Sequence, residues 1–287
     1  MIKEITAKLK GKNIEDYKRV SYALYKDIYY KYLSSSVDTA TQQLLFILGC
    51  QRSGSSMMYE IFSKDNRTKV FGEVNYLNSN DTEKRLRLNP LPEVKASLSR
   101  YQHPIIVLKP IVESQNVLQL LSTFDNSQAV WLFRHYADVA QSNIKRWGAE
   151  NGHRNIQYML SGDQSNWRAQ HVSPTTFDTV QELVARREWL PHDYAALFWW
   201  VRNRIYVEKA LYKNGLVFTC KYEKLVANPV HSMCLIYDFM AVDMLSDKVV
   251  AHIHPRSVGK GSDIPISPEI KDLCEQLLET LNACAEN

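Results

Sequence analysis

The sequence of 287 residues has few cysteines and no long hydrophobic run. Its five cysteines, at positions 50, 220, 234, 274 and 284, are an odd number and include no C-x-x-C pair. This pattern argues against a disulfide framework and favours reduced thiols in a cytoplasmic setting. The longest apolar runs, LLFILG and ALFWWV, are too short to span a bilayer. The first residues show no apolar stretch of a signal peptide.

The chain also lacks a strong charge imbalance. Its net charge of +4 does not suggest a nucleic-acid partner. Residues 1–32 hold eight Lys/Arg against four Asp/Glu, together with six tyrosines. We expect residues 1–40 to be an N-terminal helical extension whose apolar face packs on the rest of the chain, and peripheral contact with a membrane surface or a partner is the alternative. Four residues fit that face: Ile14, Tyr17, Leu24 and Ile28.

Short apolar runs then alternate with longer amphipathic segments. We predict buried strands at residues 44–48, 105–108, 129–133 and 216–220. Helices are predicted after the first three, over Ser55–Ser63, Ser114–Phe124 and Tyr136–Trp147. This alternation predicts an α/β fold with three layers, in which helices cover both faces of a mainly parallel sheet. Ligands of such sheets bind at the carboxyl ends of the strands.

Residues 148–192 interrupt this alternation. The segment is polar and lacks a clean period, so we interpret it as an insertion that forms a lid or acceptor site. A long helix is expected from Asp193, as N-cap, to Tyr212, and a closing helix from about Ser267. The economical division is one domain over residues 41–287 that carries this insertion.

The stretch GCQRSGSS nearly matches a phosphate-binding loop. Gly49 and Gly54 have the spacing of G-x-x-x-x-G-K-[ST], but Ser55 stands where the lysine belongs and Ser56 is the final hydroxyl. A strand, a glycine loop and a helix start form an anion site, because the first backbone N–H groups of the helix are unpaired. Arg52 adds a charged planar fork suited to oxyanions.

Two other strand ends are also basic. The strands at 105–108 and 129–133 are followed by Lys109 and Arg134, and no strand ends in the carboxylate that would hold Mg²⁺. A site lined in this way neutralises an oxyanion without a metal ion. A degenerate nucleoside-triphosphate loop, or a serine-rich turn without a ligand, remains the alternative.

The segment FRHYADVAQS places Arg134 at a strand end and Ser142 eight residues later, with Asp138 and Ser142 on one helical face. Together, QRSGSS and FRHYADVAQS resemble the sulfotransferase family, which uses 3′-phosphoadenosine 5′-phosphosulfate (PAPS). The resemblance implies a P-loop-like fold that needs no metal ion. It also implies that the first motif cradles the 5′-phosphosulfate and that Arg134 and Ser142 hold the 3′-phosphate.

Further stretches of the chain are similar to the same family. VFGEVNYL resembles the segment with the catalytic carboxylate, here Glu73, and VLKPIVES the strand end whose lysine, Lys109, enters the site. VFTCKYEKLVANP carries Tyr222, and RSVGK falls where a basic loop covers the 3′-phosphate. The resemblance implies catalytic roles for Glu73, as base, Arg52 and Lys109. The donor-binding residues that it implies are Arg52, Ser53, Gly54, Ser55, Ser56, Arg134, Ser142, Tyr222, Arg256, Ser257 and Lys260.

The expected function is therefore transfer of a sulfuryl group from PAPS to a hydroxyl group of a carbohydrate or small-metabolite acceptor, with 3′,5′-ADP as the second product. Two other functions stay open at this point. One is a small-molecule kinase with a degenerate loop, against which the missing lysine argues. The other is a non-catalytic adenylate-binding module that kept the fold and lost the base.

Overall fold

The computed structural model describes residues 14–33, 41–80 and 86–285. Within these ranges the strands are β1 (Gln43–Gly49), β2 (Thr68–Phe71), β3 (Asn78–Asn80), β4 (Leu86–Leu88), β5 (Ile105–Leu108), β6 (Ser127–Phe133) and β7 (Val217–Lys221). The α-helices are α2 (Ile14–Ile28), α3 (Ser55–Lys64), α4 (Leu91–Leu98), α5 (Val117–Thr123), α6 (Tyr136–Trp147), α7 (Glu150–Leu160), α8 (Pro174–Arg186), α9 (Pro191–Glu208), α10 (Tyr222–Ala227), α11 (Pro229–Phe239) and α12 (Pro268–Cys284). Short 3-10 and π turns complete them: η1 (Tyr29–Leu33), η2 (Ile111–Asn116), η3 (Leu211–Lys213) and η4 (Asp247–Val250).

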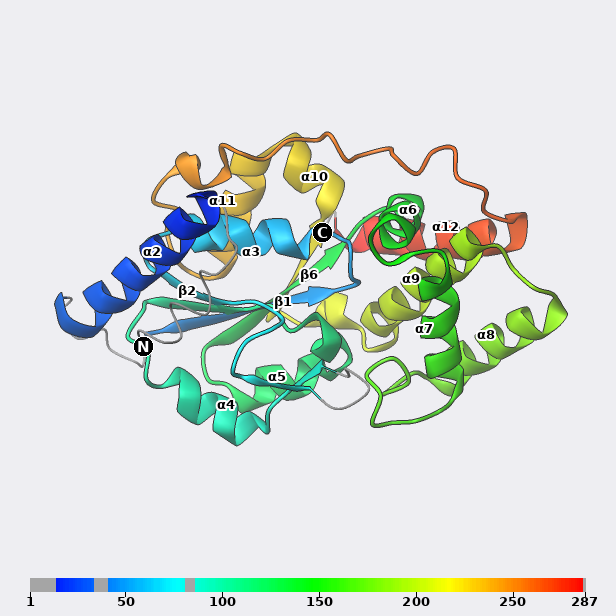
Figure 1. The fold of residues 1–287 in the computed structure, drawn as a ribbon, viewed down its shortest axis with the longest axis horizontal. Helices are drawn as coiled ribbons and strands as arrows, with labels where there is room; N and C mark the ends of the chain where they lie inside the picture. Colours follow the sequence, from blue (N-terminus) through cyan, green and yellow to red (C-terminus); the bar gives the residue numbers. More distant parts are fainter. Residues whose placement is uncertain (1–13, 34–40, 81–85, 286–287) are drawn as a thin grey trace.

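Five strands form one parallel sheet in the order β2-β5-β1-β6-β7, and β3 and β4 form a separate antiparallel pair (Figure 1). The four predicted strands are all present, each within two residues of its expected bounds. Helices cover both faces of the sheet, so the predicted three-layer α/β/α fold with a parallel sheet is confirmed. Parallel order brings all five carboxyl ends to one edge of the sheet.

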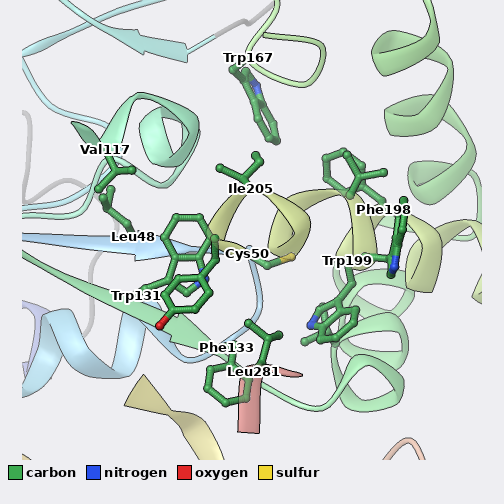
Figure 2. Close-up of a cluster of buried hydrophobic side chains, with 14 of the residues drawn as sticks. Leu48, Cys50, Val117, Trp131, Phe133, Trp167, Phe198, Trp199, Ile205 and Leu281 are labelled. Carbon is green, nitrogen blue, oxygen red and sulfur yellow. The ribbon is translucent and has the colours of Figure 1, made fainter. Parts of the chain in front are cut away.

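The alternation of side chains along β1 explains the two covered faces. Leu44, Phe46 and Leu48 point to the cluster that α4, α5, α9 and α12 complete. Leu45 and Ile47 point to the other cluster, with α3, α10 and α11. Figure 2 shows the first cluster, where Trp131 and Phe133 of β6 meet side chains of α9. Each large side chain buried there contributes roughly 1.5–3 kcal/mol of hydrophobic free energy.

Several predicted bounds were wrong. The segment 148–192 is largely helical rather than irregular, because it forms α7 and α8, which pack on α9. The helix expected from Asp193 begins at Pro191, and Asp193 is not the N-cap but accepts from the Leu190 backbone N–H at 3.1 Å. The helix expected over Ser114–Phe124 is divided into η2 and α5. The edge strand β2 was missed because it is short and half-buried.

The apolar face predicted for the N-terminal helix was also wrong. Ile14, Tyr17 and Ile28 are exposed on α2. Lys26 of α2 is buried instead, and its Nζ donates to the carbonyls of Ser63 and Asp65 at the end of α3, at 3.0 and 2.9 Å. These carbonyls have no partner inside their own helix, so the ammonium group caps it. In the described part of the chain, no helix is long and apolar enough to cross a membrane.

A buried histidine beside the N-terminal helix predicts a loss of stability in acid. His103 packs on Tyr30, and its ring nitrogens have no hydrogen-bond partner, although Nε2 lies 3.5 Å from Asp27 Oδ1. Burial, with Lys69 and Lys26 nearby, lowers the pKa of His103 to about 3. The unfolded chain takes up this proton near pH 6.5, so this group lowers the free energy of unfolding by about 1.4 kcal/mol per pH unit as the pH falls from 6.5 towards 3.

We expect His103→Gln to remove this part of the pH dependence. Urea unfolding of both proteins between pH 7 and pH 4 measures the difference, with His254→Gln, which changes an exposed histidine, as the control. Parallel pH profiles for wild type and His103→Gln would contradict the assignment of a neutral, buried imidazole.

Candidate active site

The loop between β1 and α3 depends on two glycines with positive φ. Gly49 has φ +124°, and a Cβ there would overlap the carbonyl oxygen of Leu132 on the neighbouring strand β6. Gly54, with φ +99°, precedes α3, and a Cβ there would lie 2.5 Å from Cδ2 of Tyr222. Only glycine fits both the dihedral angle and the space. The loop is therefore held against β6 and against the residue that follows β7.

The first turn of α3 supplies donors without a side-chain cap. Its N-cap is Gly54, which makes no side-chain hydrogen bond, so the turn keeps unpaired backbone N–H groups and the positive end of the helix dipole. Ser53 is buried and its Oγ has no hydrogen-bond partner, whereas Ser55 is buried and Ser56 exposed at the helix start. This combination is suited to an anion.

Arg52 brings a guanidinium to the same loop. It has φ +69°, and its Nε donates to Ser142 Oγ of α6 at 3.0 Å. The ring centre of Trp147 lies 5.5 Å from the guanidinium carbon. Burial lowers the pKa of Arg52, and the nearby charges of Arg146 and Arg134 lower it further. The site thus concentrates positive charge, which an anionic ligand would relieve.

The ends of β5 and β2 bring a lysine and a carboxylate together. Lys109 is buried, and its Nζ lies 3.1 Å from Ser56 Oγ and 3.1 Å from Glu73 Oε1. Glu73 follows β2 and its side chain is 39% exposed, so the carboxylate is paired with Lys109 yet reachable from solvent. Lys109 therefore stands between the phosphate-type loop and a candidate base.

Arg134, at the end of β6, is buried and contacts Asp138, Ser257 and Tyr222. Its Nη2 donates to Asp138 Oδ2 at 2.9 Å and to the carbonyl of Ser257. The guanidinium stacks on the ring of Tyr222, 4.4 Å from its centre, and the Tyr222 hydroxyl is hydrogen-bonded to Ser257 Oγ. The predicted basic loop thus lies beside Arg134 through Ser257.

The predicted residues occupy neighbouring positions, with differences in detail. Arg256 and Lys260 are exposed in the basic loop, on either side of the half-buried Ser257. Ser142 accepts from Arg52 and not from Arg134, so it joins the loop after β1 to the helix α6 that follows Arg134. The described residues contain no cluster of three metal-ligating side chains, at His252 and His254 or elsewhere.

Sequence reasoning missed two contributors, Arg146 and Trp147. Both lie in the last turn of α6 and both are near Arg52. The sequence signal was their position: they are four and five residues beyond Ser142 on the same predicted helix, within reach of a ligand held at its side. The contact of Trp147 with Arg52 depends on the fold, which brings the last turn of α6 to the loop after β1.

A test of the loop geometry is the substitution Gly54→Ala. We expect a loss of roughly 2–4 kcal/mol in the free energy of unfolding, because alanine is strained at this positive φ and its Cβ also overlaps the Tyr222 ring. Gly162→Ala is the matched control, since Gly162 also has a positive φ but nothing within 4 Å of a Cβ. Equal losses in the two variants would show that Tyr222 does not press on the loop.

Comparisons with known proteins identify the family of the chain. The family model described as the sulfotransferase domain matches residues 42–269. A sulfotransferase domain from the olefin synthase of Synechococcus PCC 7002 is similar in structure, with 16% identity, a TM-score of 0.51 and coverage of 87% of this chain and 98% of that domain.

A sulfotransferase from Alicyclobacillus acidocaldarius has 12% identity and a TM-score of 0.46, over 85% of this chain and 94% of its own. At such identities, the likeness to the Synechococcus domain bears on the fold alone. The comparison with curated proteins gave no match. The family model covers most of the chain, so the chain belongs to the sulfotransferase family and is an enzyme of that class.

Proposed function

We propose that this sulfotransferase takes its sulfuryl group from PAPS and transfers it to a hydroxyl group of a carbohydrate or small-metabolite acceptor without a metal ion. The observation that carries the proposal is the order of the groups along the sheet edge. From β2 to β7 they are Glu73, Lys109, the loop with Arg52, Arg134 and Tyr222. A carboxylate stands at one end of this row, and the cations and an aromatic ring follow it.

This order suits a donor with two phosphate positions. The unpaired N–H groups at the start of α3, with Arg52, Lys109 and the hydroxyls of Ser53, Ser55 and Ser56, would hold the 5′-phosphosulfate. Arg134 and Ser142, with Arg256, Ser257 and Lys260 of the basic loop, would hold the 3′-phosphate. Each charge-assisted hydrogen bond of this kind contributes roughly 1.5–3 kcal/mol.

The transfer step follows from the same positions. The acceptor oxygen attacks sulfur as the bond between sulfur and the phosphate oxygen breaks, which gives a sulfate ester and 3′,5′-ADP. Glu73 takes the proton of the acceptor hydroxyl, and Lys109 and Arg52 stabilise charge that grows on the leaving phosphate. The ion pair with Lys109 Nζ, at 3.1 Å, holds the Glu73 carboxylate at the edge of the site for this task.

The acceptor would approach on the Glu73 side. We propose that the insertion at 148–192, with α7 and α8, chooses the acceptor, within a domain over residues 41–287 that the extension 1–40 precedes. The free thiols of all five cysteines fit a cytoplasmic location. Peripheral membrane contact through the exposed tyrosines of α2 stays a prediction.

The donor is tested by calorimetry with 3′,5′-ADP and with ATP. We expect 3′,5′-ADP to bind, and Arg52→Ala to raise its Kd about tenfold to a hundredfold, through the loss of one charge-assisted hydrogen bond. This variant leaves no buried carboxylate without Arg52 as its partner, because Arg52 Nε donates to the Ser142 hydroxyl. Arg187→Ala, which removes an exposed arginine paired with Glu269, is the control. Tight binding of ATP without binding of 3′,5′-ADP would overturn the donor.

The base is tested by transfer of labelled sulfate from PAPS. Glu73→Gln keeps the size of the side chain and removes its basicity, so we expect kcat to fall about 10²–10⁴-fold with an unchanged Kd for 3′,5′-ADP. Glu60→Gln, at an exposed glutamate of α3, is the matched control. Unchanged turnover in Glu73→Gln would exclude this carboxylate as the base. Absence of transfer by the wild type to every acceptor tested, with 3′,5′-ADP bound, would favour the non-catalytic module.

A further inference from the structure

The segment 255–262 crosses the start of α6 although more than a hundred residues separate them. Figure 1 shows this part of the chain, in orange, running from the α11 side of the molecule to α12. Gly261 lies so close to α6 that a Cβ there would overlap the backbone of Ala137. The contact is therefore between two backbones, and only glycine permits it.

Asp138 is the side chain that holds this segment. It is 3% exposed in the first turn of α6, and its Oδ2 accepts from the Gly259 N–H at 3.0 Å. Its Oδ1 accepts from the Gly261 N–H at 2.7 Å. Arg134 supplies a third donor to the same carboxylate. A carboxylate in the first turn of a helix is also favoured by the helix dipole.

Two further contacts hold the same segment. The carbonyl of Ser257 accepts from Arg134, and its hydroxyl is hydrogen-bonded to the Tyr222 hydroxyl. With Gly259 and Gly261 on Asp138, the segment is fixed at three residues. Arg256 adjoins Ser257, and Lys260 lies between Gly259 and Gly261, so their backbone positions are set by these contacts.

The place of Asp138 is electrostatically unfavourable for a phosphate site. A carboxylate that pairs with Arg134 cancels part of the positive charge that an anion at this arginine would use. Removal of the negative charge alone should therefore strengthen phosphate binding. The carboxylate must contribute something else if the site is to bind phosphate well, and its two glycine N–H contacts indicate what.

We propose that Asp138 is a positioning residue that fixes the segment 255–262 over the site, so that Arg256, Ser257 and Lys260 face the 3′-phosphate beside Arg134. The inference rests on the proposed donor, PAPS, for its functional part. Its structural part, that Asp138 holds the segment in the free enzyme, does not depend on the donor.

The test combines Asp138→Asn with hydrogen exchange and donor binding. The amide keeps the size of the side chain, but its NH₂ group then faces one of the N–H donors from which the carboxylate accepts a hydrogen bond. We expect faster exchange of the amides in 255–262 in the free enzyme. We also expect Kd for 3′,5′-ADP and KM for PAPS to rise about tenfold, with kcat at saturating PAPS within about twofold, because the transfer groups are not touched.

Gly261→Ala breaks the same contact without a change of charge, so the same rise in KM is expected. Asp125→Asn removes an exposed carboxylate that pairs with Lys95 and is the charge-matched control. Unchanged or tighter binding of 3′,5′-ADP by Asp138→Asn would overturn the functional part, because charge alone would then account for Asp138. Unchanged exchange in 255–262 would overturn the structural part. A wild type that binds no 3′,5′-ADP would instead count against the proposed donor. The exchange experiment would still decide whether Asp138 holds the segment 255–262.

Discussion

Mutual repulsion among cations at one edge of the sheet is the constraint on which the site depends. Burial lowers the pKa of Arg52, and the nearby charges of Arg146 and Arg134 lower it further, while Lys109 stands at the next strand end. Partly buried cations that lack full compensation cost free energy. The fold must therefore hold them with partners that leave their charge available. An anionic ligand bound among these cations relieves their repulsion, and this relief contributes to the free energy of binding.

The partners of these cations follow this requirement unequally. Arg52 and Lys109 donate to the hydroxyls of Ser142 and Ser56, which carry no charge. Lys109 also meets a carboxylate, but Glu73 is partly exposed and so costs less to separate. Arg134 alone has a buried carboxylate partner, Asp138, whose other contacts are backbone N–H groups. Most of the positive charge on the side of Arg52 thus remains uncancelled.

Tyr222 connects the loop after β1 with Arg134 at the end of β6. Its ring lies against Gly54 on one side, where a Cβ would be 2.5 Å from it, and carries the guanidinium of Arg134 at 4.4 Å. Its hydroxyl reaches Ser257. A shift of the loop after β1 would therefore disturb Arg134 and the segment 255–262 through one side chain, since rigid packed groups transmit displacement.

Much of this arrangement was predictable because it depends on strand ends. Buried parallel strands are continuous apolar runs, so Lys109 and Arg134 could be placed at one edge before the fold was known. Contacts between residues distant in sequence were not predictable in this way. The binding of Gly259 and Gly261 to Asp138 is an example, because hydrogen bonds between backbone N–H groups and a side chain leave no residue pattern. The helices α7 and α8 were missed because their buried faces are mixed with polar side chains such as Asn155.

The insertion is joined to the catalytic side by a buried polar network. Arg202 of α9 is fully buried and donates to Gln115 Oε1 at 3.0 Å and to the carbonyl of Trp167, and burial lowers its pKa to about 10. Gln115 also binds Gln170, and it lies in η2, six residues after Lys109. Loss of these acceptors would leave the buried guanidinium with unpaired N–H groups, which costs more free energy than the loss of a contact at the surface. The segment that follows Lys109 and the segment around Trp167 are therefore held together through Arg202, so that substitutions in the segment 148–192 that break the contacts of Arg202 would also disturb the position of Lys109.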